Sequence, residues 1–234
     1  MIFCLWVLVV LIVQVDGLNV RVWKSKNDYP VASDFPEKAI LEKKSKTLNT
    51  AIGFSGGGSR AFTAAMGYLA ALRDLDLLKN IRYIGGISGG AWAAITFTYV
   101  QNVSDDDVFL CSIKSPEHIR YLDLKEIATG CVRSLPSQEV IPLAYYAWKN
   151  GTVDTIAESW SYAISKTYLE PVGILPNTRF SWDADTVNEI KLRNKELADE
   201  VFTIPVNKNR PYLIVGTSLV GPSLGAPYTP DNRS

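Results

Sequence analysis

The sequence predicts an α/β fold, a three-layer structure in which helices cover both faces of a parallel-rich sheet. Two short apolar segments, Thr50–Phe54 and Ile81–Ile87, are typical of strands, and each is followed by a glycine-rich turn and a longer helical segment. Because strands and helices alternate in this order, we expect parallel pairing through helical crossovers. The run RPYLIVGTSLV at residues 210–220 is β-rich and is expected to rejoin this sheet.

Helical periodicity follows each of the first two strands. Between Arg60 and Leu75, apolar residues recur at the spacing of one helix face. They are Phe62, Ala65, Met66, Leu69 and Leu72. Three alanines on the remaining face predict a helix that is covered on most sides. Ala91–Val100 is expected to be the next helix and Ser104–Asp107 an acidic turn.

The first fifteen residues, MIFCLWVLVVLIVQV, are almost wholly apolar. Their length suits the core of a signal peptide, with cleavage near Gly17, and is short for a bilayer span. An uncleaved anchor and a buried strand are the alternatives. Together with N-glycosylation acceptors at Asn102, Asn150 and Asn232, this segment predicts a secreted or secretory-pathway protein, or one anchored in a membrane by residues 1–17. Residues 18–47 are expected to be a lead-in to one domain over 48–234.

Cysteine content and net charge further limit the kinds of site and binding partner that the protein could have. Cys111 and Cys131 could close a disulfide loop worth about 3 kcal/mol on the chain-entropy model, or they are two buried free thiols. The sequence has no C-x-x-C motif and no Cys/His cluster, so we expect no zinc site. The formal net charge is zero, which gives no support to nucleic-acid binding or to electrostatic attraction to anionic membranes.

Two glycine-rich turns carry the chemistry. The second, GISGG at residues 86–90, is a G-x-S-x-G, whose spacing suits a nucleophilic serine on a sharp strand-to-helix turn. The first, GGGSR at residues 56–60, offers free backbone N–H groups at a helix start, where negative charge is favoured. A nucleophile and an anion cradle on adjacent strands are the two parts that acyl transfer needs.

Two nucleotide-binding alternatives fit the first turn less well. GGGSRA at residues 56–61 matches the G-x-G-x-x-A dinucleotide fingerprint, but that site needs an acidic residue at the end of the second strand, where this chain has Ser88. The turn also lacks the Gly-Lys-Ser/Thr that completes a P-loop.

SGGGSRA followed about thirty residues later by GISGGAW resembles the catalytic domain of group IV cytosolic phospholipase A2 and the fungal lysophospholipases, and more distantly patatin. The resemblance covers roughly residues 48–100 well. It implies that Ser88 is the nucleophile and that Gly57 and Gly58 donate backbone N–H groups to the oxyanion. It also implies that Arg60 holds the lipid phosphate. Ser59 replaces the aromatic residue usual in that family, which we expect to matter little.

The resemblance further implies a Ser-Asp dyad that cleaves phospholipid or lysophospholipid acyl esters. The single histidine, His118, follows Ser88 too closely for a hydrolase triad, which favours the dyad. The family places its aspartate several hundred residues after the serine, in an Asp-Gly turn, and Asp154, Asp183, Asp185 and Asp231 lack that context. We therefore expect a partial version of a longer enzyme in which the base, and most of the activity, is absent.

Two function classes remain open: a lipid acyl hydrolase, with a transacylase as its close variant, and a non-catalytic lipid-binding scaffold. We expect no cofactor and no metal, including no calcium requirement, because the lead-in has no room for a lipid-docking domain. A cap-like helical insertion is expected over about 105–205. The aromatic residues that gather there predict either an acyl-chain pocket that touches lipid or a small aromatic core of the cap itself, and we favour the core. They are Tyr145, Tyr146, Trp148, Trp160, Tyr162, Tyr168, Phe180 and Trp182.

Overall fold

The computed structural model describes residues 50–112, 114–121, 132 and 140–217. The chain divides into two compact units, one of residues 46–180 with 203–234 and the other of residues 1–45 with 181–202. Both glycine-rich turns and the strands beside them lie in the first unit. Residues 1–49, which hold the expected leader, and 218–234 lie outside the described residues, as does Cys131.

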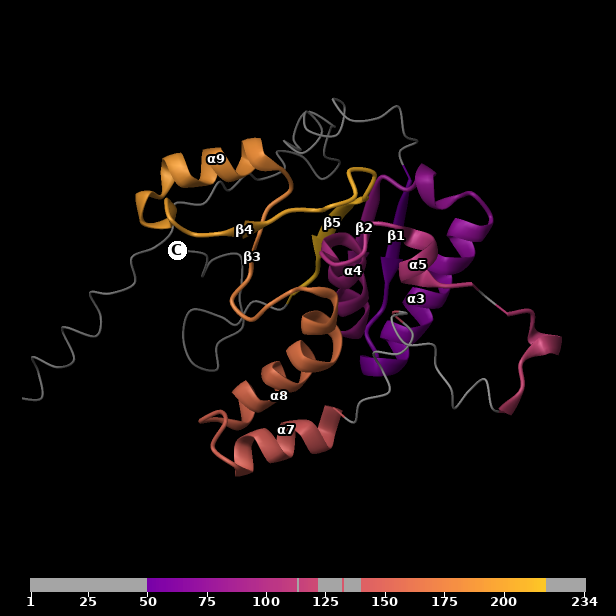
Figure 1. The fold of residues 1–234 in the computed structure, drawn as a ribbon, viewed down its shortest axis with the longest axis horizontal. Helices are drawn as coiled ribbons and strands as arrows, with labels where there is room; N and C mark the ends of the chain where they lie inside the picture. Colours follow the sequence, from indigo (N-terminus) through magenta and orange to yellow (C-terminus); the bar gives the residue numbers. More distant parts are fainter. Residues whose placement is uncertain (1–49, 113, 122–131, 133–139, 218–234) are drawn as a thin grey trace, which may run out of the picture. The chain divides into compact units, whose positions relative to one another are not determined.

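The first unit contains a parallel sheet of the order β1-β2-β5 (Figure 1). Its strands are β1 (Ala51–Phe54), β2 (Tyr83–Gly86) and β5 (Tyr212–Val215). Both pairs are parallel, with Ala51 opposite Tyr83 and Tyr83 opposite Tyr212. The predicted α/β fold with a parallel sheet is confirmed, and so is the return of the chain to this sheet after residue 210.

Helix α3 (Gly58–Asp74) follows β1, and helix α4 (Gly89–Tyr99) follows β2. The two helices pack on each other, and α4 also packs on all three strands. Nine of the eleven residues of α4 are buried, which explains why it is apolar on every side. Helix α3 differs from expectation, because Tyr68 is 62% exposed and only one face is buried. Alanine suits both a buried and an exposed face, so the three alanines did not distinguish them.

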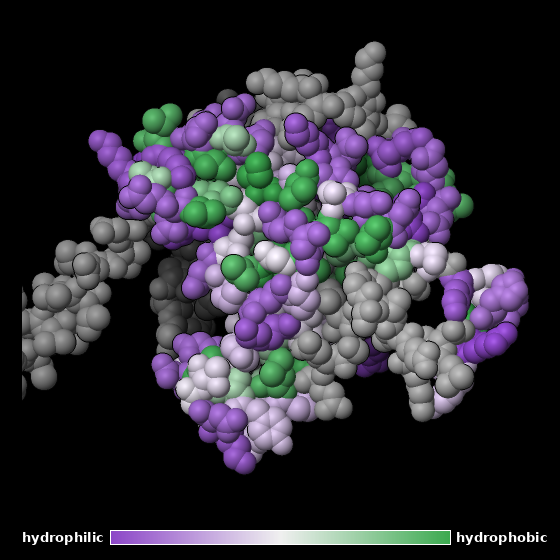
Figure 2. Space-filling model, viewed as in Figure 1, coloured by the Kyte–Doolittle hydropathy of each residue, from purple (hydrophilic) through white to green (hydrophobic). Residues whose placement is uncertain are grey.

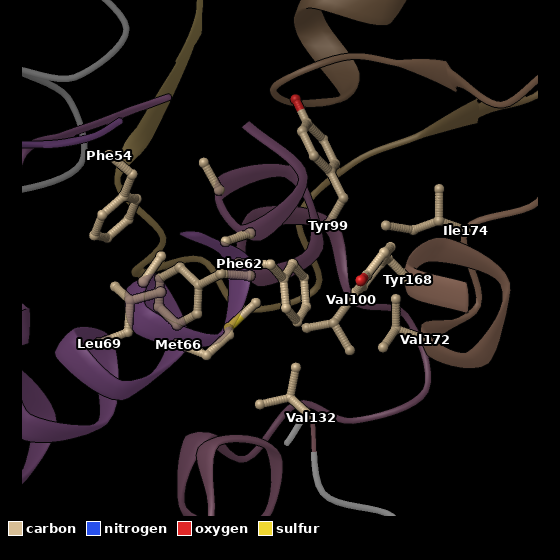
Figure 3. Close-up of a cluster of buried hydrophobic side chains, with 14 of the residues drawn as sticks. Phe54, Phe62, Met66, Leu69, Tyr99, Val100, Val132, Tyr168, Val172 and Ile174 are labelled. Carbon is tan, nitrogen blue, oxygen red and sulfur yellow. The ribbon is translucent and has the colours of Figure 1, made fainter. Parts of the chain in front are cut away.

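The core lies between the helices and one face of the sheet (Figure 3). Phe54 and Ile84 of the strands belong to one buried cluster with Phe62 and Met66 of α3 and Phe97 of α4. On the other face, within the described residues, the rings of Tyr83 and Tyr212 meet edge to face at 6.3 Å, and Ile214 is 53% exposed.

The expected acidic turn at 104–107 is the start of a short helix, α5 (Asp106–Leu110). The Asp105 carboxylate accepts a hydrogen bond from the Asp107 N–H at 2.8 Å and so caps the helix. Two further acids in the first turn suit the positive end of the helix dipole. We did not predict this helix because a cluster of aspartates is typical of turns as well as of helix starts.

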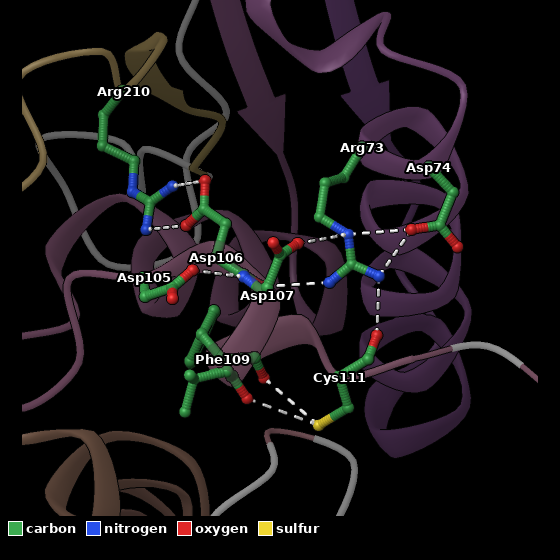
Figure 4. Close-up of polar contacts among 9 residues, drawn as sticks. Arg73, Asp74, Asp105, Asp106, Asp107, Phe109, Cys111 and Arg210 are labelled. Carbon is green, nitrogen blue, oxygen red and sulfur yellow. Dashed lines mark hydrogen bonds and ion pairs between the residues drawn. The ribbon is translucent and has the colours of Figure 1, made fainter.

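Two arginines form ion pairs that connect α5 to α3 and to the start of β5 (Figure 4). Arg73, at the end of α3, pairs with Asp74 and Asp107 and donates hydrogen bonds to the backbone oxygens of Asp106 and Cys111. Arg210, just before β5, makes a two-pronged ion pair with Asp106, with N–O distances of 2.6 and 2.8 Å. Cys111, at the end of α5, is disulfide-bonded.

Helices α7 (Val140–Lys149) and α8 (Ile156–Ile164) form a helical hairpin. Small buried residues, Ala144, Ala147 and Ala163, let the helices approach closely. A capping box starts α8: Thr155 accepts from the Glu158 N–H, and Glu158 accepts from the Thr155 N–H. The hairpin is followed by the π-helical segment η5 (Ser165–Leu169) and the 3-10 segment η6 (Glu170–Val172).

The aromatic residues of this region do not form the separate core that we favoured. Tyr145, Tyr146, Trp148 and Trp160 are between 44% and 55% exposed, whereas Tyr168 is fully buried in the core beside α3 and α4. At the α7–α8 end of the first unit, Figure 2 shows hydrophobic and pale, weakly polar residues exposed beside hydrophilic ones.

The remaining elements are short. They are the 3-10 segments η2 (Leu78–Asn80) and η3 (Pro116–His118) and the two-residue strands β3 (Arg179–Phe180) and β4 (Phe202–Thr203). In the second unit, α9 (Ala184–Arg193) begins at Asp183, whose carboxylate accepts from the Thr186 N–H, and η7 (Lys195–Leu197) follows it. In the part of the chain that the structure describes, no helix is both long enough and apolar enough to span a membrane.

Candidate active site

The first glycine-rich turn lies at the start of α3, where its backbone N–H groups have no side-chain cap among the described residues. Gly57 has φ 144° and Gly58 has φ 61°, conformations that L side chains rarely adopt. The N-cap residue of the helix is Gly57, which has no side chain to cap the first N–H groups, and the first turn holds no acidic residue. The positive end of the helix dipole is therefore not neutralised within the helix, and it favours an anion.

The second turn places Ser88 in a strained backbone conformation between β2 and α4. Ser88 has φ 51° and ψ −128°, which costs a non-glycine residue about 1–3 kcal/mol. Its side chain is exposed and makes no capping hydrogen bond to α4. A serine held on a tight strand-to-helix turn and open to solvent is the arrangement expected of a nucleophile.

The glycines around Ser88 are required by close packing of the backbone. A β-carbon on Gly86 would lie 2.5 Å from the Gly90 carbonyl oxygen, and one on Gly90 would lie 2.6 Å from the Ser55 carbonyl oxygen. Real β-carbons do not approach other heavy atoms this closely, so each alanine would displace backbone. The G-x-S-x-G pattern thus follows from the sharpness of the turn.

The two turns lie against each other. A β-carbon on Gly56 would lie 3.1 Å from Cβ and 3.7 Å from Oγ of Ser88, and one on Gly89 would lie 2.1 Å from the Gly58 carbonyl oxygen. The structure therefore brings Gly57, Gly58 and Ser88 together, as the motif spacing suggested. The starts of α3 and α4, neither of which has a side-chain cap, therefore lie close together.

Arg60 lies in the first turn of α3, and its side chain is exposed. No carboxylate of the described residues pairs with it, so the alternative of a helix-start arginine held in an ion pair is not observed. Arg60 is two residues after Gly58 in the same helical turn, with its charge exposed to solvent.

No acid of the described residues completes a dyad with Ser88. Its hydroxyl has no hydrogen-bond partner there. Asp183 is engaged as the cap of α9, Asp154 and Asp185 are exposed, and Asp231 lies outside the described residues. His118 is exposed in η3. Across the described ranges, no group of three His, Cys, Asp or Glu side chains could hold a metal ion.

Tyr168 is a neighbour of the site that the sequence did not predict. Its hydroxyl donates a hydrogen bond to Ser59 Oγ at 2.5 Å, and its ring stacks on Trp92 with centroids 5.3 Å apart. Ser59 and Tyr168 are 109 residues apart, so no local pattern connects them. The only signal was the abundance of aromatic residues after position 140.

Comparison with known proteins agrees with this geometry. The family model for patatin-like phospholipase matches residues 53–203. Cytosolic phospholipase A2 zeta of Mus musculus is 48% identical over 42 residues, which are 18% of this chain and 5% of that protein. Cytosolic phospholipase A2 gamma of Mus musculus is 44% identical over 48 residues, 20% of this chain and 8% of that protein. Cytosolic phospholipase A2 beta of Homo sapiens is 51% identical over 43 residues, which are 18% of this chain and 6% of that protein.

No solved structure matches this chain. The matched stretches cover well under a tenth of these relatives.

The names of the relatives correct one expectation. They are cytosolic phospholipases A2, which contradicts the secretory-pathway or membrane-anchored location that we expected from residues 1–17. The error has a physical reason: apolar runs of roughly 10–14 residues occur in buried segments of globular proteins as well as in signal peptides.

Proposed function

Because this chain belongs to the patatin-like phospholipase family, we propose that it is a lipid acyl hydrolase of the phospholipase A2 or lysophospholipase type. One observation carries the proposal: exposed Ser88, in a strained backbone conformation, lies against the uncapped helix start at Gly57 and Gly58. This arrangement suits attack on an ester carbonyl with stabilisation of the oxyanion that forms.

In the proposed reaction, Ser88 Oγ attacks the carbonyl carbon of a glycerophospholipid acyl ester. The negative charge that develops on the carbonyl oxygen is held by the N–H groups of the Gly57–Gly58 turn, and removal of one such donor costs on the order of 3 kcal/mol. The leaving oxygen takes up a proton, so that a diacyl phospholipid releases a lysophospholipid and a lysophospholipid releases a glycerophosphodiester. The acyl group stays on Ser88, and water then releases the fatty acid.

A base must take the Ser88 proton in the first step and return it to the leaving group. In the proposed dyad this base is an aspartate, and no described residue fills the role. Among the described residues, the Ser88 hydroxyl has no hydrogen-bond partner.

Arg60 is proposed to bind the phosphate of the substrate. Its guanidinium is exposed, unpaired within the described residues, and two residues from Gly58. A planar guanidinium can bind two phosphate oxygens at once, which would fix the scissile ester beside Ser88.

The second candidate is a non-catalytic scaffold that binds lipid without cleaving it. The absence of a carboxylate partner for Ser88 among the described residues favours it. A transacylase would share the acyl-Ser88 intermediate with the hydrolase and differ only in the acceptor of the acyl group.

Hydrolysis of a lysophospholipid and a diacyl phospholipid distinguishes these candidates. Wild type is compared with Ser88→Ala and with Ser161→Ala, a control that removes an exposed serine hydroxyl from α8. Fatty-acid release by wild type and Ser161→Ala, but not by Ser88→Ala, supports the hydrolase. Vesicle binding without release in all three proteins supports the scaffold, and transfer to an added alcohol in place of water supports the transacylase.

A further inference from the structure

We propose that Tyr168 is a positioning residue that holds the first glycine-rich turn in register with the nucleophile through its hydrogen bond to Ser59. The inference rests on the proposed function, because it assigns a role in the same site. It concerns a residue far along the chain from both turns, and it makes Ser59 functionally important where the sequence suggested that it matters little.

The ring of Tyr168 lies between the first turns of α3 and α4. It is fully buried, and its centroid lies 4.5 Å from that of the Phe62 ring and 5.3 Å from that of the Trp92 ring. Figure 3 shows Tyr168 and Phe62 among the core side chains. Phe62 follows Ser59 by one turn of α3. Trp92 follows Ser88 by one turn of α4, and its N–H donates to the Ser88 carbonyl oxygen at 3.1 Å. One side chain thus contacts both helices that begin at the site.

The two ends of Tyr168 are bonded to different helices. Thr96 Oγ1 of α4 donates a hydrogen bond to the Tyr168 carbonyl oxygen at 3.3 Å, and the Tyr168 hydroxyl donates to Ser59 Oγ of α3. Because a tyrosine side chain has only two main torsions and this one is packed on both faces, it acts as a spacer of fixed length between α4 and the start of α3.

A hydrogen bond that restrains the first turn matters because the glycine backbone of this turn can adopt many conformations. Three consecutive glycines precede Ser59, and glycine loses more conformational freedom on folding than any other residue. Ser59 is the first residue after them that has a side chain. A bond at this position fixes the direction of the Gly57 and Gly58 N–H groups relative to Ser88.

The backbone that carries Tyr168 is unusual as well. Residues Ser165–Leu169 form a π-helical turn directly after α8. Such turns are rare and occur often at functional sites, because the wider turn redirects a side chain that a regular helix would aim elsewhere. Here the redirected side chain is the one that reaches Ser59.

The test measures reaction of Ser88 with a fluorophosphonate, in the full chain, for wild type, Ser59→Ala, Tyr168→Phe and the double variant. The maximal labelling rate is expected to fall about tenfold in each single variant, with the half-saturating probe concentration unchanged, because the oxyanion donors are misplaced while the binding surface remains. The double variant is expected to be no slower than either single variant, since both remove one bond.

Two controls separate positioning from a loss of structure. Ser59→Thr keeps the hydroxyl and is expected to retain the wild-type rate. Tyr68→Phe removes a hydroxyl from an exposed tyrosine of the same helix and is expected to change nothing. Wild-type rates in Ser59→Ala and Tyr168→Phe, or a loss that is equal in Tyr68→Phe, would overturn the proposal.

Hydrogen exchange tests the positioning role of Tyr168 even if the protein is not a lipid acyl hydrolase. Amides of residues 55–62 are expected to exchange faster in Ser59→Ala and Tyr168→Phe than in wild type, while those of α7 stay unchanged. Wild type that is not labelled at Ser88 overturns the proposed function. Unchanged exchange over 55–62 overturns the positioning role, whether or not Ser88 reacts.

Discussion

Gly89 shows how one methyl group would separate the two turns. In Gly89→Ala the new β-carbon would lie 2.1 Å from the Gly58 carbonyl oxygen, a contact between two backbones with no flexible side chain to move. We expect a loss of about 1–3 kcal/mol in the free energy of unfolding, measured in urea, together with loss of fluorophosphonate labelling at Ser88.

Gly67→Ala is the matched control, because Gly67 is exposed in the middle of α3 and nothing lies within 4 Å of its would-be β-carbon. It should increase the free energy of unfolding by about 0.5–1 kcal/mol, since alanine favours helix. Equal effects of the two substitutions would refute the argument from close contact.

Ionisation of Tyr99 is expected to lower the stability of the folded protein at alkaline pH. Burial, with a smaller contribution from Tyr212, raises the pKa of Tyr99 from its ordinary 10.0 to about 12. The folded protein thus keeps a proton that the unfolded chain loses at a lower pH. This contribution to stability is complete below pH 10 and is lost as the pH rises from 10 through 12, by at most about 2–3 kcal/mol. Urea unfolding at pH 9 and pH 11.5 measures it.

Tyr99→Phe should lose less stability than wild type between these two pH values. Tyr121→Phe, which changes a tyrosine that is 71% exposed, should follow wild type. If the free energy of unfolding falls equally in wild type and in Tyr99→Phe, the Tyr99 hydroxyl is not the cause of the loss of stability at alkaline pH.

Single residues also show what sequence could and could not predict about the site. Gly57, Gly58 and Ser88 were predicted as site residues from the two glycine-rich turns, and the structure gives all three a positive φ and places the two turns against each other. Their roles in the chemistry stay a prediction. Tyr168 and Ser59 were not found as a pair. A hydrogen bond between distant residues leaves no periodic signal, and any buried aromatic gives the same composition.

Among the elements, the short helix α5 depends on one buried ion pair. The Arg210 side chain is 2% exposed, is paired with Asp106, and lies 3.9 Å from the centroid of the Phe97 ring. Asp106→Asn would leave this guanidinium buried without its counter-ion. We expect a loss of about 3 kcal/mol in the free energy of unfolding, and faster hydrogen exchange in α5 and β5.

The neighbouring residue supplies the control. Asp107 also pairs with an arginine, Arg73, but its carboxylate is 82% exposed and 3.3 Å away. Asp107→Asn should cost under about 1 kcal/mol, since solvent screens an exposed pair. Similar losses for Asp106→Asn and Asp107→Asn would show that burial of the pair is not what stabilises α5.

Prediction of elements succeeded where periodicity was strong. β1, β2, α3 and α4 each lie within about two residues of their expected bounds, because a buried strand or helix repeats its apolar positions. The helices begin earlier than expected, at Gly58 and Gly89, since positions with no side chain carry no periodic signal. Helix α5 was missed because the Asp105 cap resembles a turn and because the ion pairs that hold the helix, Arg73–Asp107 and Arg210–Asp106, join residues 34 and 104 positions apart in the sequence.

For the whole molecule, the α/β class and the parallel pairing followed from the alternation of strands and helices, since few topologies join parallel strands without a helical crossover. The strand order β1-β2-β5 was not predicted. The burial or exposure of the aromatic side chains after residue 140 could not be predicted in this way. Whether a Trp or Tyr is exposed on α7 or buried like Tyr168 depends on packing between distant segments, which composition does not specify.

The exposed apolar residues of α7 and α8 lead to a prediction about lipid surfaces. Ile141 and Ile156 are 75% and 68% exposed, and the same two helices expose Tyr146 and Trp160, whose side chains suit the interface of a bilayer. With a formal net charge of zero, the chain has no overall attraction to anionic lipid. If the proposed lipid substrate is taken from a bilayer, binding should come from apolar burial at these helices.

Co-sedimentation with phosphatidylcholine vesicles measures this binding. The double variant Ile141→Ser/Ile156→Ser should bind about tenfold more weakly, because each exposed isoleucine loses part of its transfer free energy. Leu192→Ser, a change at an 80% exposed position of α9, should bind like wild type. Added phosphatidylserine or salt should change binding little, because apolar burial is not screened. Strong salt dependence, or an equal loss in Leu192→Ser, would place the lipid contact elsewhere.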